Sequence, residues 1–403
     1  MSDGGTGGQP ENPFGGIPFL GDIMKMLGSQ GGFRWDQAMQ IAYQVAAEGQ
    51  SEPNPDPLDR IALEQLARVA ELHVARVTGL PTSRTGKPVT VVPVNRTIWI
   101  QRSGDVYRPL FEGLATSLKE AKERNPEADP GATDDPTSAM WGTVIDAMAP
   151  MMLSMTAGSM LGHLGRRSLG QYDLPIPRPA SDELMLVAPN LAEFAEAWSL
   201  PGDDLKLWVC LHEIAHHTVL GVPHIGGTMT RLLGEYAAGF TADARGLVDR
   251  LDDVSFDDPS SMQSLQETFG DPQVLLGALR SEAQVALLPR LEALVATVVG
   301  VVDWVMDEVG TSLIGSYGQL TEALRRRRVE TDASDRFVER LLGLELSTAA
   351  YERGSAFATG VVERAGAEGF DPLWADERNL PTPNDIDAPG LWLARIELPT
   401  DDS

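Results

Sequence analysis

Four of the six histidines in this chain of 403 residues lie between positions 212 and 224. His212, Glu213 and His216 form the pattern H-E-x-x-H. On a helix, residues four apart lie on the same side, so the two imidazoles can bind one cation. Neutral imidazole is a good ligand for zinc, and Glu213 can take a proton from a metal-bound water. The pattern therefore predicts a Zn2+ site with His212 and His216 as ligands and Glu213 as the catalytic general base.

The residues around this pattern are mostly apolar, which predicts a buried helix. Two histidines and a glutamate inside such a helix would lose their contacts with water, and a metal ion is a partner that replaces them. The alternative is a set of core histidines satisfied by ordinary hydrogen bonds, with no metal. Cys210, the single cysteine of the sequence, lies close by. We interpret it as a small buried apolar residue rather than as a ligand or nucleophile.

The third protein ligand that a catalytic zinc usually has must come from elsewhere in the chain. The extended pattern H-E-x-x-H-x-x-G-x-x-H does not apply, because Val219 and Val222 stand at the glycine and third-histidine positions. Glu235 is the favoured candidate, since an antiparallel helix after the following loop would bring it back towards the metal. His224 in that loop and more distant residues are the alternatives, whereas His217 points away from the ligand side of the helix.

The hydrophobic periodicity predicts a mainly α fold with a few short strands near the zinc helix. The zinc helix is expected over about 205–220, followed by a loop over 221–227 and a second helix over 228–251. The methionine-rich stretch 140–164 predicts two packed helices broken near Pro150 rather than a membrane span. Extended segments are expected at 89–94, 96–100 and 183–189. Other helices are expected at 35–47, 58–77, 107–122, 191–198, 272–285, 287–309, 318–328, 333–343 and 347–367, and the proline-rich end of the chain is expected to be irregular.

Composition and charge limit the partners of the protein. Lys and Arg total 32 against 58 Asp and Glu, a net charge of −26, which disfavours binding to nucleic acid and to an anionic membrane surface. We therefore expect no nucleic-acid partner and no stable membrane association. The start of the sequence lacks the basic and apolar regions of a secretory signal, and a single cysteine fits a reducing compartment, so a cytoplasmic location is expected. Residues 1–33 are expected to form a flexible Gly-rich tail, 34–396 one domain, and 397–403 an acidic tail.

Five stretches occur in an order that resembles one known family. They are LGQYDLP (169–175), LVAPN (186–190), WVCLHEIAHHTVLGVPH (208–224), LRRRR (324–328) and LLGLEL (341–346). The chain resembles the type-2 zincin-like metallopeptidases of actinobacteria and their relatives, closer to the zinc-dependent metalloprotease branch than to the branch associated with deazaflavin-coenzyme biosynthesis. The resemblance implies a largely α-helical zincin-like domain over residues 34–396. It also implies a zinc-dependent hydrolase acting on a peptide or protein substrate, with His212 and His216 as ligands and Glu213 as general base.

One position departs from this family. Many of its members carry Glu-Gly-Trp or Glu-Gly-Tyr in the helix that corresponds to residues 295–305, where this chain has Val299, Gly300 and Val301. If that glutamate is the family's third ligand, this chain lacks it, and Asp303 one helical turn later is a substitute. Without a substitute, the chain would be a catalytically inactive zincin-like scaffold or a partner-binding protein.

Other polar residues have a functional and an ordinary interpretation. The arginines at 325–328 could bind a substrate carboxylate, but a solvated basic helix end is favoured. Tyr172 or Tyr236 could donate a hydrogen bond to an oxyanion, but packed aromatic side chains with satisfied hydroxyls are favoured.

Overall fold

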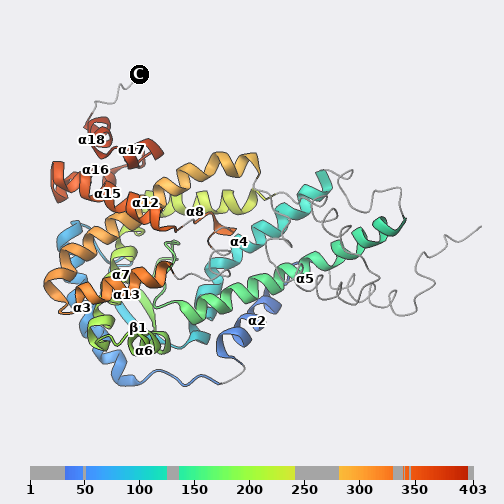
Figure 1. Ribbon diagram of the computed structural model, residues 1–403, viewed down its shortest axis with the longest axis horizontal. Coiled ribbons are helices and arrows are strands. Elements are labelled where there is room, and N and C mark those ends of the chain that lie inside the picture. Colours follow the sequence, from blue (N-terminus) through green and yellow to red (C-terminus); the bar gives the residue numbers. More distant parts are fainter. Residues whose placement is uncertain are drawn as a thin grey trace, which may run out of the picture.

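The protein is almost entirely helical in the computed structural model, which describes residues 32–48, 51–124, 136–240, 281–329, 339, 341–344 and 346–397 (Figure 1). The expected mainly α fold with a few short strands is confirmed. The helices are α2 (Trp35–Ala47), α3 (Pro57–Thr78), α4 (Arg96–Arg124), α5 (Pro136–Arg167), α6 (Ala188–Ala197), α7 (Gly202–Val219), α8 (Pro223–Ala238), α12 (Glu282–Leu313), α13 (Tyr317–Val329), α15 (Thr348–Ala365), α16 (Asp371–Ala375), α17 (Pro383–Asp387) and α18 (Pro389–Glu397), with short 3₁₀ helices at Ala367–Phe370 and Glu377–Asn379.

Two short strands, β1 (Thr90–Val94) and β2 (Glu183–Val187), form a parallel pair in the described residues. Thr90 lies opposite Glu183 and Val94 opposite Val187. Their side chains are largely buried, as expected for parallel strands covered by helices. Because β2 also contacts α7, the strand pair holds the loops before it close to the helix that carries the H-E-x-x-H pattern.

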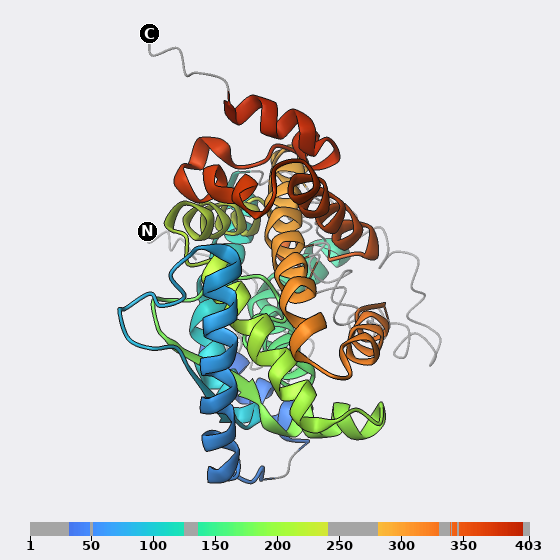
Figure 2. The same cartoon turned by 90° about the vertical axis from the view of Figure 1, so that its left-hand side faces the viewer.

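Helix α7 is the central element of the fold. It buries thirteen residues, among which are His212, Glu213, His216, His217 and Cys210. The helices α3, α12 and α6 all pack against it, so it is covered on several sides (Figure 2). A polar group on this helix therefore exchanges contacts with water for contacts with protein, which sets the conditions for the site.

Close helix crossings in this fold depend on glycine. α12 and α15 cross at Gly300 and Gly354, where a Cβ atom on Gly300 would lie 2.1 Å from the Gly354 carbonyl oxygen. α2 and α5 pack in the same way, since a Cβ on Gly158 would lie 2.5 Å from the Ala38 carbonyl oxygen. Among the described helices, α12 is the one long and apolar enough to span a membrane, and 61% of its apolar window is buried inside the protein.

Several expected elements differ from the structure. Residues 96–100 begin helix α4 instead of forming a strand, because the Asn95 side chain caps the helix by accepting the Ile98 backbone N–H at 2.9 Å. The segment 221–227 is not a loop, because α8 starts at Pro223, a residue type suited to the first helical turn. α5 continues through Pro150 without a break. The proline-rich end of the chain, which was expected to be irregular, forms the helices α17 and α18.

Some expectations fall outside the described residues. Of the expected tail 1–33, only residues 32 and 33 are described, and of the expected tail 397–403 only residue 397 is described. Most of the expected helices 333–343 and 272–285 also lies outside, as does the second half of the expected helix 228–251.

Candidate metal centre

His212 and His216 face each other one turn apart on α7, and their ring centroids lie 4.3 Å apart. Both side chains are held by aromatic stacking, His212 against Trp208 at 5.0 Å and His216 against Tyr172 at 6.0 Å. The predicted convergence of two imidazoles on one side of a helix is present in the structure. It follows from the spacing of four residues and from the apolar neighbours that make the helix buried.

The hydrogen bonds of the two rings determine which nitrogen remains for a metal. The Nδ1 atom of His216 lies 3.1 Å from the His212 carbonyl oxygen and donates to it. The Nδ1 atom of His212 lies 3.3 Å from Oε1 of Glu213. Metal-binding histidines almost always engage their second nitrogen in this way. Nε2 is therefore the nitrogen left for a metal on both rings.

Glu213 is completely buried, and its carboxylate is held by the backbone of the preceding loop. Its Oε2 atom accepts hydrogen bonds from the backbone N–H groups of Gln171 (2.7 Å) and Tyr172 (2.9 Å). Gly170 packs directly against the carboxylate, since a Cβ atom there would lie 2.3 Å from the Glu213 Cδ. The Trp99 indole N–H fixes the same loop by donating to the Gly170 carbonyl oxygen at 2.7 Å.

Burial controls the charges in the site. Burial and, to a smaller extent, the Asp173 charge raise the pKa of Glu213 to about 8. The hydrogen bonds from the two backbone N–H groups lower this pKa but do not outweigh burial. Burial and the Arg328 charge lower the pKa of His212 to about 3, and burial with His212 lowers the pKa of His216 well below its usual value. Both rings are therefore neutral at pH 7, which is the form that binds a metal.

His212, Glu213 and His216 line one cavity of about 80 Å³ between α7, α13 and the loop after α5. Its other polar lining residues include Asp173, Arg327 and Glu339. Asp173 is already engaged: its Oδ1 accepts the Leu169 backbone N–H at 3.1 Å, and its Oδ2 pairs with Arg327 at 2.9 Å. Burial alone would raise the pKa of Asp173, but the Arg327 charge and hydrogen bond lower it.

The structure does not bring Glu235 to the two histidines. Glu235 is exposed and pairs with Arg231 at 3.1 Å on the surface of α8. The physical reason is that α8 buries a stripe of residues that includes Leu232, Leu233 and Tyr236, and Glu235 falls outside this stripe. Within the described part of the chain, no group of three His, Cys, Asp or Glu side chains is placed to hold a metal ion.

The alternative third ligands also lie elsewhere. His224 donates from Nε2 to the Leu373 carbonyl oxygen at 2.9 Å. Asp303 lies 3.8 Å from Arg328 and faces a neighbouring groove rather than the metal cavity. Val299 is buried in the apolar core and does not line the cavity. Cys210 is likewise buried away from it, as expected from the sequence.

Two acidic residues of the cavity, Asp173 and Glu339, were missed as candidates from the sequence. Asp173 lies in the LGQYDLP stretch, so its motif was visible even though its role was not. Glu339 is more than 120 residues from His216 along the chain, and no spacing rule connects them. Only the folding of the chain back over α7 places it at the cavity.

Comparison with known proteins agrees with this geometry. The sequence profile described as zincin-like metallopeptidase matches residues 34–393. The chain belongs to the zincin-like metallopeptidase family. A crystal structure described as a “putative hydrolase with a novel fold” from Chloroflexus aurantiacus has the same fold, with a TM-score of 0.59 and 23% sequence identity, covering 91% of this chain and 99% of that one. A search of curated proteins gave no match.

The family implies zinc, and the residues of the cavity fit this metal in their chemistry. Two neutral imidazoles present Nε2, and a carboxylate beside them is fixed by two backbone N–H groups. The described side chains supply two of the three ligands that a catalytic zinc usually has. The third requires a side chain of the cavity to change its rotamer or a residue outside the described ones.

Proposed function

We propose that this member of the family is a zinc-dependent peptidase in which His212 and His216 hold the metal and Glu213 is the general base. The observation that carries the proposal is the pair of imidazoles 4.3 Å apart, facing one cavity together with the Glu213 carboxylate. The family assignment supports a hydrolase, and the H-E-x-x-H geometry supports a peptidase among the hydrolases.

The residues of the metal centre have defined parts in this proposal. A bound zinc would supply a Lewis acid that activates water and polarises the scissile carbonyl. Glu213 accepts the proton at Oε1, because Oε2 already accepts two N–H groups, from Gln171 and Tyr172, whereas Oε1 has a single partner, Nδ1 of His212. Burial raises the pKa of Glu213 to about 8 in the metal-free site, so the residue holds a proton well enough to pass it to the leaving amine, and a bound cation would favour the ionised form that accepts the proton first.

We propose Glu339 as the third ligand. It is half-buried, it lines the same cavity as the two histidines, and carboxylate oxygen is a usual zinc ligand. Glu339→Gln should therefore weaken zinc binding, while Glu235→Gln, a matched acid-to-amide change on the surface of α8, should not.

The substrate is proposed to be a peptide or protein that lies along the groove next to the metal cavity. This groove, of about 970 Å³, runs between α13 and α15 and shares Arg328, Leu346 and Tyr351 with the metal cavity. Its size suits a ligand of several residues. Its exposed arginines and glutamates provide polar walls for a polypeptide backbone.

The test combines metal analysis with cleavage of a peptide library. We expect one zinc per chain and cleavage that falls about 1,000-fold in Glu213→Gln, since a general base contributes roughly 10²–10⁴-fold, with zinc retained. Glu235→Gln should cleave like the wild type. Absence of zinc from protein purified without chelators would refute the proposal.

A second candidate function is a zinc-bearing scaffold without catalysis. It is favoured by the finding that the described residues bring only two ligands together. Stoichiometric zinc with no cleavage of any library peptide would support this candidate over the peptidase.

A further inference from the structure

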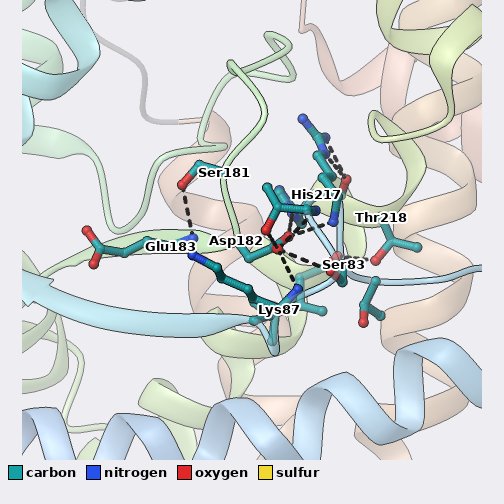
Figure 3. Close-up of polar contacts among 12 residues, drawn as sticks. Ser83, Lys87, Ser181, Asp182, Glu183, His217 and Thr218 are labelled. Carbon is teal, nitrogen blue, oxygen red and sulfur yellow. Dashed lines mark hydrogen bonds and ion pairs between the residues drawn. The ribbon is translucent and has the colours of Figure 1, made fainter.

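A buried carboxylate beside the metal centre ties two loops together. Asp182, directly before β2, accepts hydrogen bonds from the backbone N–H groups of Arg84 (2.6 Å), Thr85 (3.0 Å) and Lys87 (3.4 Å). It also accepts the hydroxyls of Ser83 and Thr85 (Figure 3). Asp182 is therefore a rigid anchor, since five donors fix a carboxylate that is 7% exposed.

His217 connects this anchor to the loop that holds Glu213. Its ring is 1% exposed, with Nε2 lying 3.7 Å from Oδ1 of Asp182 and Nδ1 lying 3.2 Å from the hydroxyl oxygen of Tyr172. The Arg84 guanidinium fixes the backbone at the same position by donating to the His217 carbonyl oxygen at 2.6 Å. His217 on α7 thus lies between two side chains, Asp182 and Tyr172, of the chain segment that precedes β2.

The charge of Asp182 determines the direction of the second hydrogen bond. A distance of 3.7 Å is too long for a hydrogen bond, but a carboxylate facing Nε2 still favours a proton on that nitrogen. A neutral imidazole with a proton on Nε2 has its lone pair on Nδ1. The Tyr172 hydroxyl therefore donates to His217, and it is not available to donate to a substrate oxyanion.

Tyr172, which this hydrogen bond holds in place, contacts the metal centre in two ways. Its backbone N–H donates to Oε2 of Glu213 at 2.9 Å. Its ring stacks on the His216 ring with an angle of 11° between the planes. Holding the Tyr172 hydroxyl therefore restricts both the proposed base and one proposed ligand.

We propose that His217 is a positioning residue: with Asp182 facing its Nε2, it accepts the Tyr172 hydroxyl at Nδ1 and so fixes the loop whose N–H groups hold the Glu213 carboxylate. Its effect on catalysis rests on the proposed peptidase function, whereas its effect on the loop does not. The second histidine of the His216-His217 doublet thereby has a role distinct from metal binding.

Four variants test this role. His217→Leu removes both ring nitrogens, Tyr172→Phe removes only the hydroxyl, and His217→Asn restores an acceptor oxygen at the position of Nδ1. Thr218→Val is the matched control, because it deletes another buried side-chain hydrogen bond on α7, from the Thr218 hydroxyl to the Ile214 carbonyl oxygen.

Hydrogen exchange of the Gln171 and Tyr172 amides is the first readout, since these N–H groups bind Glu213. We expect both amides to exchange at least about tenfold faster in His217→Leu and Tyr172→Phe, close to the wild-type rate in His217→Asn, and unchanged in Thr218→Val. The double variant His217→Leu/Tyr172→Phe should be no worse than His217→Leu, because the two groups act as one pair.

Peptide cleavage is the second readout. We expect kcat to fall about 10–100-fold in His217→Leu with KM within about twofold of wild type, as for other residues that orient a metal centre. Wild-type amide exchange in His217→Leu, or the same acceleration in Thr218→Val, would overturn the inference. If the wild type neither binds zinc nor cleaves peptides, the proposed function fails, and the exchange rates still decide the role of His217.

Discussion

The contact between Gly170 and Glu213 gives a sharp prediction. A Cβ atom on Gly170 would lie 2.3 Å from Cδ, 2.5 Å from Oε1 and 2.7 Å from Oε2 of Glu213, whereas ordinary contact begins at 3.4 Å. In Gly170→Ala the carboxylate or the loop must therefore shift by about 1 Å, and a misplacement of that size can lower a catalytic rate about 100-fold. We also expect a loss of about 1–3 kcal/mol in unfolding free energy from overpacking.

The assay for Gly170→Ala measures kcat for a peptide that the wild type cleaves, together with zinc affinity by competition with a chelator. The three atoms nearest to the added Cβ all belong to Glu213 and none to a histidine ligand, so zinc affinity should stay within a few fold of wild type while kcat falls. Gly113→Ala in α4 is the control, because apart from the surrounding helix backbone and its chain neighbours no atom lies within 4 Å of its added Cβ. Wild-type cleavage by Gly170→Ala would refute the placement of Glu213, and loss of zinc would refute the assignment of separate roles to ligands and base.

Three further predictions concern stability and reactivity. Gly300→Ala should lower the unfolding free energy by about 3 kcal/mol in urea titrations, because its Cβ would meet the Gly354 backbone; an unchanged midpoint would contradict the close crossing of α12 and α15. Burial opposes the ionisation of Asp182, but its hydrogen bonds outweigh burial and hold its pKa far below the usual value. The wild type should therefore exceed Asp182→Asn in unfolding free energy by about 2 kcal/mol at pH 7, and this difference should shrink as the pH falls below about 4; a difference that grows in acid would show that the sign is wrong. Burial raises the pKa of the Cys210 thiol, so it should react with a disulfide reagent only after unfolding; rapid reaction of the native protein would show that α7 is less buried than described.

The spacing within H-E-x-x-H determined the two-histidine part of the site. Because an α-helix repeats every 3.6 residues, residues 212 and 216 must share a face wherever the helix packs, and the apolar residues around the pattern predicted that the helix is buried. The same local reasoning gave α2 its bounds, Trp35–Ala47. Local periodicity is sufficient for such features because every contact that defines them lies within one or two helical turns.

The secondary structure predicted from the sequence was wrong where two local signals favoured different conformations. The residues of 96–100 suit a strand by their side chains, but the cap at Asn95 and the packing of Trp99 against the Gly170 loop make them helical. The glycines and proline of 221–227 suggest a loop, yet Gly226 is needed for a close approach within the helical turn, where a Cβ would lie 2.4 Å from the Leu220 carbonyl oxygen. In both cases a contact with a distant or neighbouring backbone determined the conformation.

The sequence by itself determined that two imidazoles and a glutamate share the buried α7, because this depends on helix geometry and hydrophobic burial alone. Only the tertiary structure decided what surrounds them: Glu235 faces solvent, Glu339 reaches the cavity, and Asp182 and His217 secure the loop that holds Glu213. The physical reason is that these contacts join segments separated by tens to more than a hundred residues. Their formation depends on how whole helices pack, which no short pattern of residues specifies.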